Sequence, residues 1–384
     1  MRSEPLEKFL RVRRERVRRK LSGPDRRRLI AGSVVFALMF VLGLALNISF
    51  FRAALVIGGV NSLQQSLLWG ALPAFVMVLL YLPIPSVLDR FDPEPLWCVV
   101  LAFLWGAVVA TGVSAEFHAL AMPRTQAASD PSFVLTVIVA PVVEELMKGS
   151  AVAGFFYFLR REFDGVVDGV VYAMFTALGF ATVENVGFYA RAALEGRDIF
   201  AQTFIVRGLI APFGHPLYTS MIGLGFGIAR ESTRMWLRVT APIVGTLLAV
   251  LLHALWNLVP RLGADIFVVS LIFWLGFVVA FSVIVAALVV RKGRTIRRYL
   301  RDEVVLGNLS EEELALVTSA FGRFKSYFVP RGEVRRRFIR SAARLALSKW
   351  HVSRAARRNK RTFSLEFIAP LRAELSELRE KMNG

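Results

Sequence analysis

The stretch VTAPIVGTLLAVLLHALWNLVP, residues 239–260, contains no charged side chain. As an α-helix with a rise of about 1.5 Å per residue, it is long enough to cross a hydrocarbon core of about 30 Å. Lipid cannot satisfy an open backbone, so a segment this apolar is expected to cross as a helix. The stretch therefore predicts a membrane-spanning helix that carries His253 and Asn257.

Similar segments recur along the whole chain. Other uncharged runs cover residues 29–51, 53–88, 96–115, 208–229 and 266–290. Two segments of the same apolar texture, 132–159 and 166–190, carry charged residues inside them. Each segment is long enough for one crossing. The sequence therefore predicts an all-α protein, a polytopic membrane bundle of about eight transmembrane helices.

The net charge of +19 is concentrated at the two ends of the chain. Residues 1–28 hold 12 Lys or Arg and residues 291–384 hold 23 of the 48 in total. Eight crossings place both ends on one side, and the positive-inside rule makes that side the cytoplasm. We expect these basic ends to attract anionic lipid. Nucleic acid is not an expected partner, because a basic patch alone is only an electrostatic footprint.

This distribution divides the chain into three parts. They are a basic cytoplasmic segment at 1–28, a transmembrane core at 29–290 and a basic helical cytoplasmic tail at 291–384. In the tail, Ser310 followed by Glu313 predicts a capping box at the start of a helix. Further helices are predicted around 333–358 and 365–382.

Charged residues inside the apolar segments are the first candidates for function. Each costs roughly 2.5–3.5 kcal/mol at the bilayer centre and needs a partner, water or a neutral form. In segment 132–159, Lys148 can reach Glu144 at i, i+4 and Glu145 at i, i+3. An ion pair that ties helices together explains one carboxylate. Two carboxylates beside one cation also suit activation of a water molecule, because their proton affinities are driven apart.

Segment 166–190 combines a close-packing surface with a polar pair. Gly169, Ala173, Ala177 and Ala181 form a strip of small residues at i, i+4 spacing, along which another helix can approach closely. The pair at positions 184 and 185, Glu184-Asn185, follows this strip. Taken alone, the pair is equally compatible with interhelical hydrogen bonding and with catalysis.

Two histidines fall in the remaining apolar segments. His215 precedes a helix whose first position Pro216 can occupy. His253 and Asn257 are four residues apart, so both side chains share one helix face and can donate hydrogen bonds to one oxygen. A single such histidine is more often a packed core residue. Two of them beside buried glutamates favour a site.

The ordered set of motifs resembles the PrsW-type intramembrane proteases. These are relatives of the CAAX-protease and bacteriocin-processing superfamily of glutamate-dependent membrane peptidases. The resemblance covers roughly residues 84–260. It rests on Asp-Pro-Glu-Pro at 92–95, Glu-Glu-x-x-Lys at 144–148, the block from Asp168 to Asn185, His215 with Pro216 and Thr219, and His-x-x-x-Asn at 253–257.

The resemblance implies roles for these residues. Glu144 would be the general base on the attacking water, with Glu145 and Lys148 orienting it. His253 and Asn257 would form an oxyanion pocket.

Two further site residues follow from the same resemblance. His215 would orient the water or transfer a proton. Glu184, with its neighbour Asn185, stands where many members of the superfamily have a histidine, and would be a co-activator of the water.

The residues together with this resemblance therefore imply an intramembrane endopeptidase that cleaves a membrane-anchored or membrane-proximal protein. The resemblance adds an anti-sigma-factor-like regulator as a substrate class. We expect no cofactor; the alternative is a zinc enzyme with His215, His253 and Glu144 as ligands, although the chain lacks the His-Glu-x-x-His spacing. A proton-coupled transporter would be expected to show related halves, which we do not find. A non-catalytic membrane scaffold is the third alternative.

Overall fold

A computed structural model describes residues 23–160, 162–212, 214–319, 322–356 and 364–383. All regular secondary structure in this part of the chain is helical. Within these described residues, six helices are long and apolar enough to cross a membrane: Arg26–Ser49, Leu68–Leu88, Leu96–Thr125, Val166–Glu195, Met235–Leu262 and Asp265–Val305. The predicted fold class, a polytopic helical membrane bundle, is confirmed. The basic segment expected at 1–28 lies mostly outside the described residues.

The two other expected crossings are also helical, but each is interrupted or charged. One is continuous from α7 (Pro131–Phe133) through the π-helical η3 (Val134–Val139) into α8 (Ala140–Phe158), which carries Glu144, Glu145 and Lys148. The other consists of α10 (Arg197–Phe204), the π-helical η4 (Ile205–Ile210) and, after a break, α11 (Gly214–Glu231). This break places His215 in the first turn of α11.

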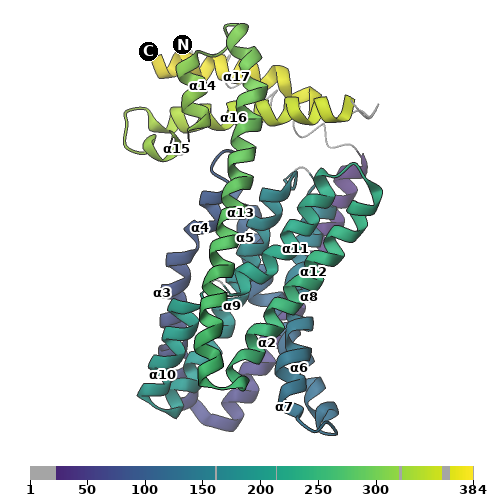
Figure 1. The fold of residues 1–384 in the computed structure, drawn as a ribbon, viewed down its shortest axis with the longest axis vertical. Helices are drawn as coiled ribbons and strands as arrows, with labels where there is room; N and C mark the ends of the chain where they lie inside the picture. The colour runs from purple at the N-terminus through teal and green to yellow at the C-terminus, as the bar shows by residue number, and fades with distance from the viewer. Residues whose placement is uncertain (1–22, 161, 213, 320–321, 357–363, 384) are drawn as a thin grey trace. The chain divides into compact units, whose positions relative to one another are not determined.

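The chain forms two compact units, which Figure 1 shows as ribbons. The first contains residues 1–79 and 98–261. Besides the helices above, its elements are α2 (Gly23–Gln65), η1 (Ser66–Ala71), most of α3 (Leu72–Tyr81), most of α5 (Leu96–Leu104), η2 (Trp105–Ala110), α6 (Thr111–Thr125), α9 (Val166–Glu195) and α12 (Met235–Leu258) with most of η5 (Val259–Leu262).

Helix α9 is the core of the first unit, because 89% of the residues in its most apolar 18-residue stretch are buried. The predicted strip of small residues lies in this buried part, and both Ala173 and Ala177 have no exposed surface. A Cβ on Gly169 would lie 2.3 Å from the carbonyl oxygen of Gly223 in α11. Since no side chain fits at that distance, the two backbones approach as closely as the strip predicts. The backbones of α9 and α11 are therefore in close contact at Gly169 and Gly223.

The second unit contains residues 80–97 and 262–384. Its helices are α4 (Pro83–Leu88), α13 (Ala264–Val305), α14 (Glu311–Thr318), α15 (Gly322–Lys325), α16 (Gly332–Ala356) and α17 (Leu365–Asn383). The capping box is confirmed, because Ser310 Oγ accepts from Glu313 N at 3.1 Å and Glu313 Oε2 accepts from Ser310 N at 2.7 Å. The predicted boundary after residue 290 falls inside α13, which continues without a break into the tail.

The tail is held together around one buried carboxylate. Glu303, near the end of α13, has no exposed surface. It pairs with Lys349 of α16 at 2.8 Å and with Arg372 of α17 at 2.7 Å, and accepts from Asn308 at 2.7 Å. Three helices of the tail therefore meet at a single charge-paired group.

The loop between α4 and α5 contacts the tail within the same unit. Arg344 of α16 lies 3.2 Å from Asp92, and Arg340 donates to the carbonyl oxygen of Pro93 at 3.3 Å. This acidic loop and the tail therefore lie on one face of the membrane. An even number of crossings must separate them. From α5 to α13 the described residues form six crossings, four by long apolar helices and two by the interrupted or charged segments described above.

Candidate active site

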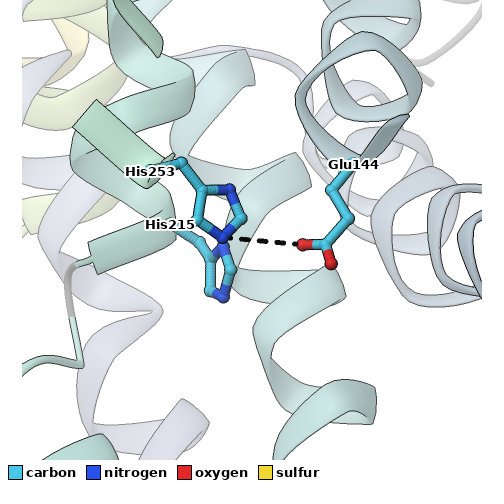
Figure 2. Close-up of side chains that lie close together, drawn as sticks. All are labelled: Glu144, His215 and His253. Carbon is cyan, nitrogen blue, oxygen red and sulfur yellow. Dashed lines mark ion pairs between the residues drawn. The ribbon is translucent and has the colours of Figure 1, made fainter. Parts of the chain in front are cut away.

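Four helices of the first unit bring the predicted residues together. Helix α8 supplies Glu144, Glu145 and Lys148, and α9, α11 and α12 supply one residue each: Glu184, His215 and His253. The side chains from α8 and α12 are buried: exposure is 4% for Glu144, 0% for Glu145 and Lys148, and 3% for His253. Figure 2 shows Glu144 pointing from α8 toward the two imidazoles.

Glu145 is the saturated member of the glutamate pair. Its Oε1 lies 2.6 Å from Lys148 Nζ and 3.0 Å from His253 Nδ1. Its Oε2 accepts a hydrogen bond from Thr219 Oγ1 at 2.8 Å. With partners on both oxygens, this carboxylate ties α8 to α11 and α12 and has little capacity left for a reacting molecule.

Glu144 is the open member of the pair. Its nearest basic atoms are Lys148 Nζ at 3.7 Å, His253 Nε2 at 3.9 Å and His118 Nε2 at 3.9 Å. All three lie beyond hydrogen-bond distance. Its Oε2 atom is buried and has no hydrogen-bond partner among the described residues. Glu144 is therefore surrounded by basic groups and separated from each by a gap.

The hydrogen bond from His253 to Glu145 fixes the direction of the imidazole. A carboxylate can only accept, so in the neutral ring Nδ1 carries the hydrogen and Nε2 keeps its lone pair. That lone pair faces Glu144 Oε2 across 3.9 Å. Two acceptors opposite each other need a donor or a cation between them. Tyr218, whose ring stacks on His253 with centroids 5.4 Å apart, supports this orientation.

Lys148 and His215 form a second chain of contacts. Lys148 Nζ lies 3.0 Å from His215 Nδ1, and its ammonium lies 4.2 Å from the centre of the Phe180 ring. The ammonium can only donate, so His215 Nδ1 accepts and its Nε2–H donates to Glu184 Oε2 at 3.0 Å. Both nitrogens of His215 are thus engaged, unlike those of His253.

The predicted Glu184-Asn185 pair has a partner that sequence reasoning missed. Arg207 of η4 forms an ion pair with Glu184, and its Nε donates to Asn185 Oδ1 at 2.7 Å. The guanidinium also lies 3.7 Å from the centre of the Phe188 ring. An arginine directly before the uncharged run 208–229 was the available signal, because a charge at membrane depth requires a counter-charge.

His118 of α6 is the second residue that sequence reasoning missed. The uncharged run ends at Ala115, but the helix continues to Thr125 and carries the imidazole to Glu144. His118 Nε2 is buried and has no hydrogen-bond partner among the described residues. The His118 side chain is 36% exposed, so it lies between the buried carboxylate of Glu144 and the surface of the helix bundle.

Asn257, predicted to share a helix face with His253, contacts the segment that precedes α8. Its Nδ2 donates to the carbonyl oxygen of Thr136 in η3 at 2.9 Å. The carboxamide therefore braces α12 against the segment before α8, one helical turn from His253.

The types of side chain at this site are suitable ligands for a divalent metal ion. Glu144, His215 and His253 each offer one ligand atom, and these atoms lie within 4.8 Å of one another. One carboxylate and two imidazoles are a ligand set of catalytic zinc. Glu145 would act as the outer carboxylate that orients a ligating histidine. However, the Lys148 ammonium already occupies the neighbourhood of His215, so a metal would have to share that position with a cation.

Comparison with known proteins identifies relatives of the central part of the chain. The family profile described as PrsW family intramembrane metalloprotease matches residues 94–288, which include every site residue named above. Protease PrsW of Geobacillus kaustophilus is 30% identical over 146 residues, which are 38% of this chain and 60% of that protein. Protease PrsW of Oceanobacillus iheyensis is 26% identical over 166 residues, and that of Bacillus subtilis 27% over 144.

These matches cover part of each relative. The chain matches 71% of the Oceanobacillus iheyensis protein and 61% of the Bacillus subtilis protein. No solved structure matches the chain. The tail beyond residue 288 lies outside the family match. The resemblance seen in the sequence is thus confirmed for residues 94–288.

Proposed function

Because the chain belongs to the PrsW family of intramembrane metalloproteases, we propose that it is an intramembrane endopeptidase in which Glu144 activates the attacking water. Its substrate would be a membrane-anchored or membrane-proximal protein, with an anti-sigma-factor-like regulator as one class. The relatives named Protease PrsW support a peptidase. The tail and both termini would face the cytoplasm, as the positive-inside rule favours.

The gap between Glu144 and His253 is the observation that carries this proposal. Glu144 Oε2 and the lone pair on His253 Nε2 face each other across 3.9 Å. A water molecule between them would donate one hydrogen to each acceptor and direct its own lone pair away from both. Polar atoms at this separation are commonly bridged by water. The asymmetry of the glutamate pair therefore favours Glu144 over Glu145 as the base.

The reaction would proceed by direct attack of water. The water oxygen bonds to the carbonyl carbon of the substrate while Glu144 accepts its proton. The carbon–nitrogen bond then breaks, and the proton passes to the leaving amine. Lys148, 3.7 Å from Glu144 Oε2, supplies positive charge beside the developing oxyanion. In this arrangement His253 holds the water, and Asn257 braces α12.

A metal-dependent version is the second candidate, favoured by the cluster of Glu144, His215 and His253. A metal held there would polarise a carbonyl and lower the pKa of a bound water. In both versions Glu145 orients His253 through the same hydrogen bond. Metal analysis of the purified chain, together with activity after chelation, separates the two candidates.

The proposal is tested by comparing new protein N-termini in membranes of cells that produce different forms of the chain. We expect the wild type to generate at least one cleavage within or next to a membrane anchor, and Glu144→Gln to abolish it. Glu195→Gln is the matched control, since Glu195 is exposed at the end of α9. Cleavage that persists with Glu144→Gln would refute the role of this residue. A transporter or scaffold would show no cleavage dependent on the chain.

A further inference from the structure

The tail carries an exposed aromatic turn, defined here as residues 324–329, which covers the end of α15 and the start of the connection to α16. Phe324, Tyr327 and Phe328 are 63%, 59% and 75% exposed. The two phenylalanine rings contact each other edge to face, with centroids 5.3 Å apart. Three neighbouring aromatic side chains that face away from a folded core mark a site of interaction.

This turn is built to present its aromatic side chains. Ser326 is fully buried, and its Oγ donates to the carbonyl oxygen of Gly322 at 2.7 Å. A Cβ on Gly332 would lie 1.9 Å from the carbonyl oxygen of Ser326, so the chain returns tightly against itself. Because the turn is anchored from the inside, the rings stay outside.

Positive charge surrounds the aromatic turn. Lys325 and Arg331 are exposed, and the guanidinium of Arg336 lies 4.0 Å from the centre of the Tyr327 ring. The sequence has no acidic residue between Glu313 and Glu333. Aromatic side chains flanked by Lys and Arg are typical of the interface between membrane and water. Such a surface is complementary to anionic lipid.

The turn also lies close to a membrane face within its own unit. Helix α16 begins directly after it, and Arg340 of this helix contacts Pro93 and Asp92 in the loop that joins two apolar helices. From Gly332 to Arg340 the helix rises about 12 Å at 1.5 Å per residue. The turn is thus within reach of lipid headgroups.

We propose that the aromatic turn inserts Phe324 and Phe328 into an anionic membrane leaflet and so fixes the tail against the membrane. Lys325, Arg331 and Arg336 would contact the headgroups. The proposal is independent of proteolysis, because it concerns residues outside the family match and a partner other than the substrate.

The test uses the full chain with its single cysteine removed by Cys98→Ala. An environment-sensitive fluorophore is attached at Phe328→Cys, or at Leu306→Cys as the matched control, since Leu306 is also exposed, at 61%. Each protein is reconstituted into vesicles of phosphatidylcholine with phosphatidylglycerol, or of phosphatidylcholine alone. Lipids that carry a spin label on the acyl chain then quench any fluorophore that enters the leaflet.

In the anionic vesicles, spin-labelled lipid should quench most of the fluorescence from position 328. The quenching at 328 should be much smaller in phosphatidylcholine alone, and position 306 should show none in either kind of vesicle. Adding Lys325→Glu and Arg331→Glu to the labelled protein should restore the signal at 328. Equal quenching at the two positions, or quenching at 328 that ignores lipid charge, would overturn the proposal. So would a fluorophore shielded from aqueous iodide but untouched by spin-labelled lipid, because a protein would then cover the turn.

Discussion

Replacing the two adjacent glutamates one at a time should show that they contribute unequally to stability. Glu145→Gln removes a carboxylate whose contacts to Lys148, His253 and Thr219 are all 3.0 Å or shorter. Breaking a buried ion pair by removing one partner costs about 3–5 kcal/mol. Glu144 remains 3.7 Å from the Lys148 ammonium and compensates part of that loss. We therefore expect Glu145→Gln to lower the free energy of unfolding by about 3 kcal/mol, the lower end of this range.

Glu144→Gln should cost much less, because Glu144 Oε2 has no hydrogen-bond partner among the described residues. The assay is reversible unfolding of the full chain in mixed micelles, titrated with a denaturing detergent and followed by tryptophan fluorescence. About 3 kcal/mol corresponds to an unfolding equilibrium constant changed by roughly two powers of ten. Equal destabilisation by the two variants would refute the distinction between a saturated and an open glutamate.

Three other substitutions test separate parts of the structure. Glu303→Gln should loosen the packing of α16 and α17, because it leaves Lys349 and Arg372 without their buried counter-charge. Amide hydrogen exchange in these two helices should become faster, whereas the control Glu312→Gln, at an exposed position, should leave it unchanged. Gly223→Ala should lower the free energy of unfolding by about 1–3 kcal/mol, because the new Cβ meets a backbone oxygen at 2.2 Å. The control in the same unfolding assay is Gly187→Ala, since the space around Gly187 is open. His118→Phe should slow proteolysis with little change in stability, since His118 Nε2 lacks a hydrogen bond in the described structure; a wild-type rate would exclude a role beside Glu144.

The sequence predicts the membrane helices and most of the residues that meet at the candidate site. Both predictions rest on the free-energy cost of placing polar and charged groups in lipid. Uncharged runs of helix-spanning length have few alternatives to a transmembrane helix. Against that background Glu144, Lys148 and Glu184 stand out, since each charge opposes insertion unless it has a partner. The strip of small residues that begins at Gly169 likewise predicts the close approach of another helix, and in the structure this helix is α11.

Other features of the site depend on neighbours that a sequence does not reveal. Which glutamate is saturated is decided by Thr219 and His253, on helices far apart in the sequence. The bond from Asn257 to a carbonyl oxygen in η3 depends on how that segment passes α12. His118 was missed because a charged residue ends the apolar run while the helix continues. These features follow from packing.

The central claim, that Glu144 activates the water, is tested most directly with the purified chain and the substrate found from its new N-termini. The cleavage rate is measured for the wild type, Glu144→Gln and the exposed control Glu195→Gln, each reconstituted in lipid and each shown to be folded. Loss of a general base lowers the rate about 10²- to 10⁴-fold. We predict a loss of that size for Glu144→Gln and a wild-type rate for Glu195→Gln. Cleavage by Glu144→Gln at the wild-type rate would contradict the account.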